Sequence, residues 1–169
     1  MSAADGVRVS LDVAVEPAVA FEVFTTELDA WWGRGPRFRF VPPYAGSMRL
    51  KPGLGGRLLH VVNEAGRIFE VGRIEAWEPP SRLAFTWRLA NFRPGQITRV
   101  EVRFEPVEAG TRVTVSHDGW DSLPPEHPAR HGLTGRAFVL MKGGWWGELL
   151  TSLKDVAEHA AEHPGGHQR

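Results

Sequence analysis

Residues 138–160 read FVLMKGGWWGELLTSLKDVAEHA and contain the strongest periodicity of the chain. Apolar side chains recur there every three or four residues, at Phe138, Met141, Trp145, Leu149, Leu153, Val156 and Ala160. This spacing predicts one apolar stripe along a long amphipathic helix. In this phase Trp146 lies about 100° around the helix from Trp145, so we expect Trp146 to pack on the rim or on a neighbouring loop. Gly143 and Gly144 weaken a helix by about 1 kcal/mol each, which predicts close backbone packing or a later helix start.

Seven strand-like segments precede this helix. Most show the alternation of a half-buried strand, and two are indicated by the glycine-rich turn that joins them. The seven segments are residues 7–15, 48–50, 58–62, 67–78, 83–89, 100–104 and 113–117. Helical spacing predicts two short helices between the first two strands, within residues 17–32. The apolar phase shifts at Gly72, which predicts a β-bulge. Residues 119–132 hold three prolines and show no period, so we expect a mobile, irregular loop there.

The composition excludes several classes of protein. Among 169 residues, 20 basic and 20 acidic side chains give no net charge, and no block of like charges is present to bind nucleic acid. The lack of cysteine excludes disulfides and thiolate chemistry and agrees with a reducing compartment. Residues 1–10 show neither the cationic start nor the apolar run typical of a leader peptide, and no apolar run reaches the roughly 18 residues that span a bilayer. We therefore expect a cytoplasmic protein without membrane insertion.

Seven short motifs, together with their order, resemble one family. They are Glu16-Pro17, Trp31-Trp32-Gly33, residues 52–56, residues 72–80, residues 83–87, residues 117–120, and Gly144-Trp145 with Leu149 and Leu153. Each motif alone is a turn or an aromatic anchor, and only the set is informative. Over residues 7–158 the chain resembles the bacterial members of the activator-of-Hsp90-ATPase-like family. That family lies within the START-like, polyketide-cyclase-like (SRPBCC) superfamily, which is related to birch pollen allergen.

The resemblance implies a helix-grip fold of the α+β class. Such a fold has a curved antiparallel seven-stranded sheet, in the chain order β-α-α-β-β-β-β-β-β-α, wrapped on a long C-terminal helix. It implies a single START-like domain over residues 1–169, with a core at about 7–160 and a flexible tail at 161–169. It also implies a ligand cavity between the sheet and the terminal helix.

A set of apolar side chains on the predicted inner faces is expected to line this cavity. Aromatic and thioether groups give adaptable apolar walls, and the set comprises Phe69, Phe85, Trp87, Val102, Phe104, Val115, His117, Met141, Trp145, Leu149 and Leu153. The alternative is that these residues simply fill the core. The two interpretations differ only in the volume that remains empty.

His117 is the best polar candidate because it shares a strand face with Val113 and Val115. A neutral imidazole there can orient a ligand carbonyl or act as a general acid or base. The alternative is a hydrogen-bonded structural histidine where the strand enters a loop. Asp118 points to the opposite face of a regular strand. No serine, threonine or lysine is linked to the pair by spacing, so no catalytic triad is predicted.

Other motifs carry weaker signals. His127 and His131 are four residues apart, but Pro128 argues against the helix that would align them, so no metal site is predicted. The glycine-rich turn at residues 53–56 lacks the lysine and hydroxyl residue that end a phosphate loop. His60 can equally face solvent from its strand. Three arginines near the expected cavity mouth, which can attract an anionic head group or lie scattered on the surface, are Arg34, Arg37 and Arg39.

These observations leave three functions open. The leading one is binding of an apolar or amphipathic small molecule, as carrier or sensor, without a cofactor. The second is an enzyme of the polyketide cyclase or dehydratase type that uses the same cavity. The third is a co-chaperone or stress-response protein, although the Asn-x-Asn-x-Trp-His-Trp element of the eukaryotic Hsp90 activators is missing, so Hsp90 is not the expected partner. An exposed strand edge also makes a homodimer plausible.

Overall fold

A computed structural model describes residues 6–63 and 65–162 of the chain. Seven strands form one antiparallel sheet, and three α-helices and two short 3-10 turns complete the fold. The elements in chain order are β1 (Val7–Val13), α1 (Pro17–Thr26), α2 (Leu28–Trp31), β2 (Ser47–Leu50), β3 (Arg57–Val61), β4 (Ile68–Glu78), β5 (Arg82–Trp87), β6 (Thr98–Val107), β7 (Gly110–Asp118), η2 (Trp120–Ser122), η3 (Pro128–Arg130) and α3 (Gly135–Glu162). The flexible tail expected at 161–169 lies, from residue 163 onward, outside the described residues.

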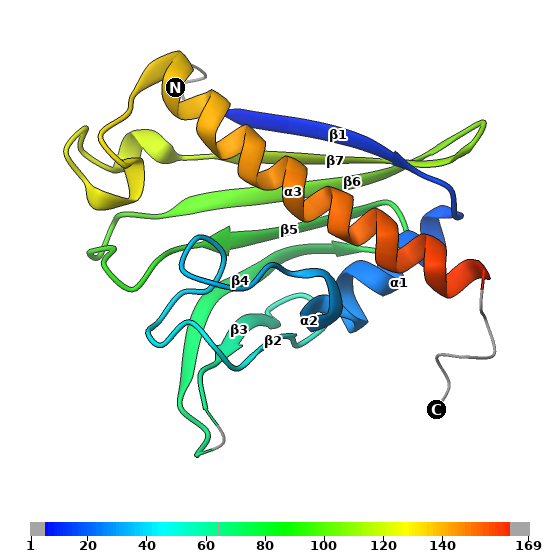
Figure 1. The fold of residues 1–169 in the computed structure, drawn as a ribbon, viewed down its shortest axis with the longest axis horizontal. Helices are drawn as coiled ribbons and strands as arrows, with labels where there is room; N and C mark the ends of the chain where they lie inside the picture. The colour runs from blue at the N-terminus through cyan, green and yellow to red at the C-terminus, as the bar shows by residue number, and fades with distance from the viewer. Residues whose placement is uncertain (1–5, 64, 163–169) are drawn as a thin grey trace.

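The sheet has the strand order β1-β7-β6-β5-β4-β3-β2, which places the first strand beside the last. Val7 lies opposite His117 and Val9 opposite Val115 in the β1–β7 pair. Helix α3 lies across one face of the sheet, and α1 lies beside the C-terminal half of α3 (Figure 1). This arrangement confirms the predicted helix-grip fold and its element order.

Alternation along the strands explains which face of the sheet is covered. On β6 the side chains of Val100, Val102 and Phe104 are at most 1% exposed, whereas those between them carry charges. On β7 Val113 and Val115 are buried in the same way. Because successive strand side chains point to opposite faces, one sheet face is apolar and packs under α3. Burial of this face supplies the main stabilising term of the fold.

The predicted bulge near Gly72 is confirmed. Leu58 pairs with Gly72 but Leu59 pairs with Glu70, so Val71 is the extra residue in β4. A Cβ at Gly72 would collide with the backbone carbonyl of Thr86 on the neighbouring strand. Glycine is therefore required at this position, because the bulge brings the two backbones together.

Helix α3 differs in phase from the prediction. It begins before both glycines, and its buried side chains are Phe138, Lys142, Trp146, Leu149, Leu150, Leu153 and Ala157. Trp146 is only 4% exposed, so a position at the rim is wrong, but its ring packs on Trp32 after α2, as expected of a contact with a neighbouring loop. Trp145 is partly buried instead. From Phe138, buried positions recur every four residues at Lys142, Trp146 and Leu150. Because one of these residues is a lysine, a search for apolar residues alone misses this spacing.

The glycines of α3 do not mark a close backbone approach. A Cβ at Gly143 would lie 3.8 Å from Val9 Cγ2, an ordinary contact, and one at Gly144 would meet nothing within 4 Å. The expected close packing at both positions is therefore wrong, as is a helix start after them.

The segment between β7 and α3 is ordered by packing. Residues 119–132, expected to be irregular, form the turns η2 and η3, and Trp120 within them is 1% exposed. The Trp120 ring lies 4.9 Å from that of Phe138 and 4.6 Å from the imidazole of His117. Arg130 Nη2 donates to the Trp120 carbonyl at 2.8 Å. The segment is therefore a loop with two short 3-10 turns, and the buried Trp120 packs it against the core.

Candidate functional site

A chain of hydrogen bonds crosses the core from α3 to β5. Trp146 Nε1 donates to His117 Nδ1 at 3.1 Å, and His117 Nε2 lies 2.9 Å from Thr98 Oγ1. The Thr98 hydroxyl in turn donates to the Trp87 carbonyl at 2.8 Å. Since the hydroxyl proton is used in that bond, the His117 Nε2 nitrogen carries a proton and donates to Thr98. These hydrogen bonds link α3 to the sheet through the His117 imidazole and fix the orientation of that ring.

This network keeps His117 neutral. Burial, with a smaller contribution from the charge of Lys142, holds the pKa of His117 well below its usual range. Both ring nitrogens already have partners within the protein, so neither is directed at a ligand. Asp118, the next residue, is exposed and belongs to the other face of the sheet. In this geometry His117 acts as a positioning residue for the Trp146 indole.

Lys142 lies one helical turn before Trp146 and is only 5% exposed. Its Nζ lies 4.5 Å from the ring centroid of Trp145, 5.0 Å from that of Trp120 and 5.3 Å from that of Trp87. Tryptophan rings attract a cation through their electron-rich faces. Within residues 6–63 and 65–162, however, no hydrogen bond or ion pair forms with Nζ. A buried ammonium without an anionic partner is a costly arrangement.

Burial lowers the pKa of Lys142 to about 7. The amine therefore changes charge near neutral pH, whereas an ordinary lysine does so above pH 10. Perturbed groups of this kind concentrate at functional sites. Sequence reasoning missed Lys142 because a charged residue on a helix is normally assigned to solvent. The signal that can find it is its spacing of four residues from both Phe138 and Trp146.

A small cavity of about 30 Å³ adjoins Lys142 between the sheet and α3. This volume holds about one water molecule. We call the surrounding residues the aromatic pocket, and they are Trp32, Arg37, Phe38, Phe40, Trp87, His117, Lys142, Trp145, Trp146 and Leu149. The Trp32 and Trp146 rings meet edge to face at 5.8 Å, and the Trp32 Nε1 donates to the Phe38 carbonyl at 2.8 Å. The wall of the pocket is therefore held in place by hydrogen bonds as well as packing.

The structure brings only part of the expected lining set to this pocket. Trp87, His117, Trp145 and Leu149 line it. The members that are buried in the core and do not line it are Phe85, Val102, Phe104, Val115 and Leu153, and those partly buried against the core are Phe69 and Met141. Most of the space expected beneath α3 is thus filled by side chains. The lining residues that sequence reasoning did not assign to the cavity are Trp32, Phe38, Phe40, Lys142 and Trp146, and Arg37 was placed only at its mouth.

An ion pair closes the pocket toward solvent. Arg37 makes two 2.9 Å hydrogen bonds to the carboxylate of Glu148 on α3, and its guanidinium lies over the Phe38 ring at 4.8 Å. Both charged side chains are about half exposed, at 47% and 53%. Exposed pairs contribute little to stability. The rim of the pocket is therefore its most easily opened part.

The other arginines and His60 stabilise the fold instead. The Arg39 side chain is fully buried and bonds to the Asp29 carboxylate at 3.1 Å, so its assignment to the surface is wrong. Asp29 also accepts from the Met48 backbone at 2.8 Å and from Arg34 at 3.4 Å. His60 is 0% exposed and bonds to the Ala45 carbonyl at 2.6 Å, so it does not face solvent. These contacts tie α2 and its following loop to β2 and β3.

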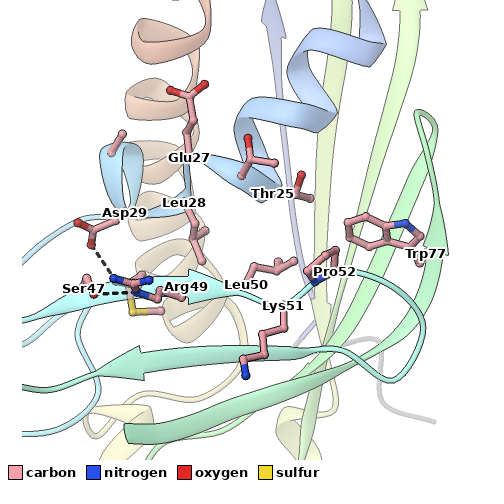
Figure 2. A pocket seen from close by; sticks show the side chains of 13 residues that line it. Thr25, Glu27, Leu28, Asp29, Ser47, Arg49, Leu50, Lys51, Pro52 and Trp77 are labelled. Atoms are coloured by element: carbon pink, nitrogen blue, oxygen red, sulfur yellow. Dashed lines mark hydrogen bonds between the residues drawn. The ribbon is translucent and has the colours of Figure 1, made fainter. Parts of the chain in front are cut away.

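A second, larger hollow lies on the surface between α1, α2 and β2 (Figure 2). Its volume is about 700 Å³, and Leu28, Leu50 and Trp77 contribute its apolar surface. Its polar side chains Thr25 and Asp29 are engaged within the protein: the Thr25 hydroxyl donates to the Phe21 carbonyl at 2.9 Å, and Asp29 bonds as described above. The groove offers room but no buried unpaired group, so we place the candidate site at the aromatic pocket.

The remaining motifs do not converge. His127 is buried and accepts from the Ala129 backbone at 3.0 Å, whereas His131 is exposed and packs on Trp145 at 5.2 Å. Gly53 and Gly55 adopt positive φ in the turn before β3, and that turn is followed by a strand instead of a helix. Among the described helices, none is long and apolar enough to cross a membrane.

The fold and the pocket under its terminal helix define a helix-grip protein. The family model described as Activator of Hsp90 ATPase homolog 1-like protein matches residues 14–158. The chain belongs to this family. A comparison with curated proteins finds no match.

Solved structures share the fold at low sequence identity. A protein from Rhodobacter sphaeroides is 23% identical, with a TM-score of 0.62 over 94% of this chain and 95% of the other. The AHSA1 protein from Silicibacter pomeroyi is also 23% identical, with a TM-score of 0.57 over 94% and 99%. The Aha1 dimer from Colwellia psychrerythraea is 17% identical, with a TM-score of 0.58 over 90% and 96%. At these identities the likeness shows the fold alone.

Proposed function

We propose that this protein binds an apolar or amphipathic small molecule in the aromatic pocket beneath α3, as a carrier or sensor. The carrying observation is that rings from three separate parts of the chain, the Trp32–Phe40 segment, β5 and α3, surround one cavity that reaches the surface beside Arg37. Aromatic walls with a few polar groups are the usual composition of small-molecule sites. The sheet does not need this cavity in order to pack on α3.

The size of the cavity constrains how a ligand enters. A cavity of about 30 Å³ is smaller than any drug-sized molecule, whose sites measure roughly 300 Å³ or more. Binding therefore requires displacement of the rim, where the exposed Arg37–Glu148 pair and the partly buried Phe38 and Trp145 lie. The hydrogen-bonded floor, made by His117 and Trp146, stays in place. The pocket thus combines a rigid floor with a yielding rim.

Binding is favoured over catalysis at this site. The cyclase or dehydratase alternative uses His117 as acid or base, but both nitrogens of His117 are engaged by Trp146 and Thr98. A ligand can contact the imidazole edge without any proton transfer.

The test is a titration with 1-naphthalenemethanol, a neutral aromatic probe, followed by two-dimensional NMR of the tryptophan indoles and leucine methyls. We expect shifts at Trp145, Trp146 and Leu149, with weaker binding in Trp145→Ala. The matched control is Trp77→Ala, which alters the surface groove instead. Shifts confined to Trp77 and Leu50, or no shifts at all, would contradict the proposal.

A further inference from the structure

In the described part of the chain, the aromatic pocket is lined by a lysine amine without a counter-charge, and an unpaired indole lies beside the pocket. Lys142 Nζ has no hydrogen-bond or ion-pair partner among the described residues, as noted above. The indole Nε1 of Trp120, a residue that is 1% exposed, also has none. The Trp120 ring centroid lies 5.0 Å from Nζ. A lysine that is only 5% exposed, lines a cavity and lacks a counter-charge points to a missing anionic partner in that cavity.

The charges around the pocket do not supply that acceptor. The groups that face Lys142 are His117 from β7, His131 from the loop before α3, and Arg37 at the rim. Glu148, the carboxylate at the rim, is already bound by both Arg37 nitrogens. The interior of the pocket is therefore short of one negative charge.

We infer that the ligand of this pocket is a carboxylate with an aromatic or aliphatic body, whose head group accepts from Lys142 Nζ. This inference rests on the proposed function. An ionised carboxylate donates no hydrogen bond and offers acceptor oxygens to the N–H donors of the Lys142 ammonium. Its head is small enough for the innermost space of about 30 Å³, while the aromatic rim covers the apolar body. A phosphate head is larger and brings more acceptors and charge than these donors satisfy.

The state of the amine agrees with this assignment. Burial lowers the pKa of Lys142 to about 7 in the free protein, and a carboxylate beside it favours the charged form again. Free carboxylic acids are ionised above about pH 5. Ligand binding is therefore expected to be accompanied by proton uptake at Lys142. Burial and the nearby Lys142 charge lower the pKa values of both His117 and His131, so neither ring charges above pH 7.

The experiment compares acids with their uncharged amides. The probes are phenylacetate, 1-naphthylacetate and decanoate, each paired with its amide, and calorimetry measures the dissociation constants at pH 7. We expect each acid that binds to bind at least about tenfold more tightly than its amide, as for a hydrogen-bonded charge. Lys142→Met should abolish the preference for the acid over its amide. The control Lys154→Met, on the same helix but paired with Glu158, should retain it.

The pH dependence provides a second readout in the unmodified protein. The dissociation constant of the acid should rise by about tenfold from pH 7 to pH 8.5 as Lys142 loses its proton, while that of the amide stays constant. This comparison decides the question even if Lys142→Met fails to fold.

The outcomes separate the two proposals. Equal binding of acid and amide would overturn the carboxylate inference and leave small-molecule binding intact. A preference that survives in Lys142→Met would overturn the assignment to Lys142. Failure of every acid and every amide to bind, together with no response to 1-naphthalenemethanol, would overturn the proposed function and this inference with it.

Discussion

The two ends of the space between sheet and α3 are built differently. Near α1, Phe104 meets the rings of Phe21 at 5.2 Å and Phe24 at 5.8 Å, and nothing polar intervenes. We call this the apolar end. Near the start of α3, the aromatic pocket instead holds a hydrogen-bonded imidazole and an unpaired amine. The space between the same sheet and helix is thus fully packed at the apolar end and incompletely packed at the aromatic pocket. The polar end is therefore where we place the proposed binding site.

The largest effect is expected at the apolar end. Phe104→Ala removes a ring that is 1% exposed and leaves a cavity between β6 and α1. Such truncations lower the free energy of unfolding by about 3–5 kcal/mol. Urea denaturation measures the change. The control is Leu140→Ala, because Leu140 on α3 is 63% exposed, and it should change the free energy of unfolding little. A loss below about 1 kcal/mol in Phe104→Ala would show that this end is not the solid core described here.

The next effect concerns Lys142 and pH. Because burial lowers its pKa to about 7, the unfolded chain carries the extra proton between pH 7 and 10. The free energy of unfolding should therefore rise with pH in this window, by up to about 1.4 kcal/mol per unit. Lys142→Met should lack that rise, and Lys154→Met should keep it. Urea denaturation at pH 7, 8 and 9 gives the three slopes; identical slopes would place the Lys142 amine in water.

A moderate effect is expected from the indole that binds His117. Trp146→Phe keeps an aromatic side chain but removes the indole N–H donor, so His117 Nδ1 is left buried without a partner. An unsatisfied buried group costs about 1–3 kcal/mol. Trp145→Phe is the matched control, since no hydrogen bond of the Trp145 side chain is present in the described structure. If both variants lose the same stability, the hydrogen bond is not what distinguishes the two tryptophans.

The smallest effect belongs to the rim. Arg37→Gln breaks an ion pair between two exposed side chains, and we expect the denaturation midpoint to stay unchanged. Faster ligand association, measured by stopped-flow fluorescence, should accompany the change because the pocket opens there. Slower association in this variant would argue that Arg37 guides the ligand instead of closing the entrance.

The sequence predicts the fold well because strand alternation survives in the structure. Val100, Val102 and Phe104 alternate with charged residues and are buried, and the phase shift at Gly72 marks a real bulge. The inward position of His117 also follows from this alternation. These features depend on the local spacing of apolar residues, which can be read directly from the sequence.

The candidate site is less predictable because its residues break the hydrophobic pattern. Lys142 occupies the buried stripe of α3, so a stripe of apolar residues alone assigns the helix a phase that favours Trp145 over Trp146. Trp120 lies in a segment without period, and its burial depends on tertiary contacts with Phe138 and His117. The agreement between hydrophobic pattern and burial is lost at the site where we expect a binding function to override stability.

The central claim is that Lys142 is buried in an aromatic pocket without a counter-charge. The most direct measurement is an NMR titration of the Lys142 Hε–Cε resonances in the free protein, assigned by comparison with Lys142→Met. Burial predicts a pKa of about 7. A Lys142 that titrates at its ordinary value, above pH 10, would contradict the claim, because its amine would then be solvated or already paired.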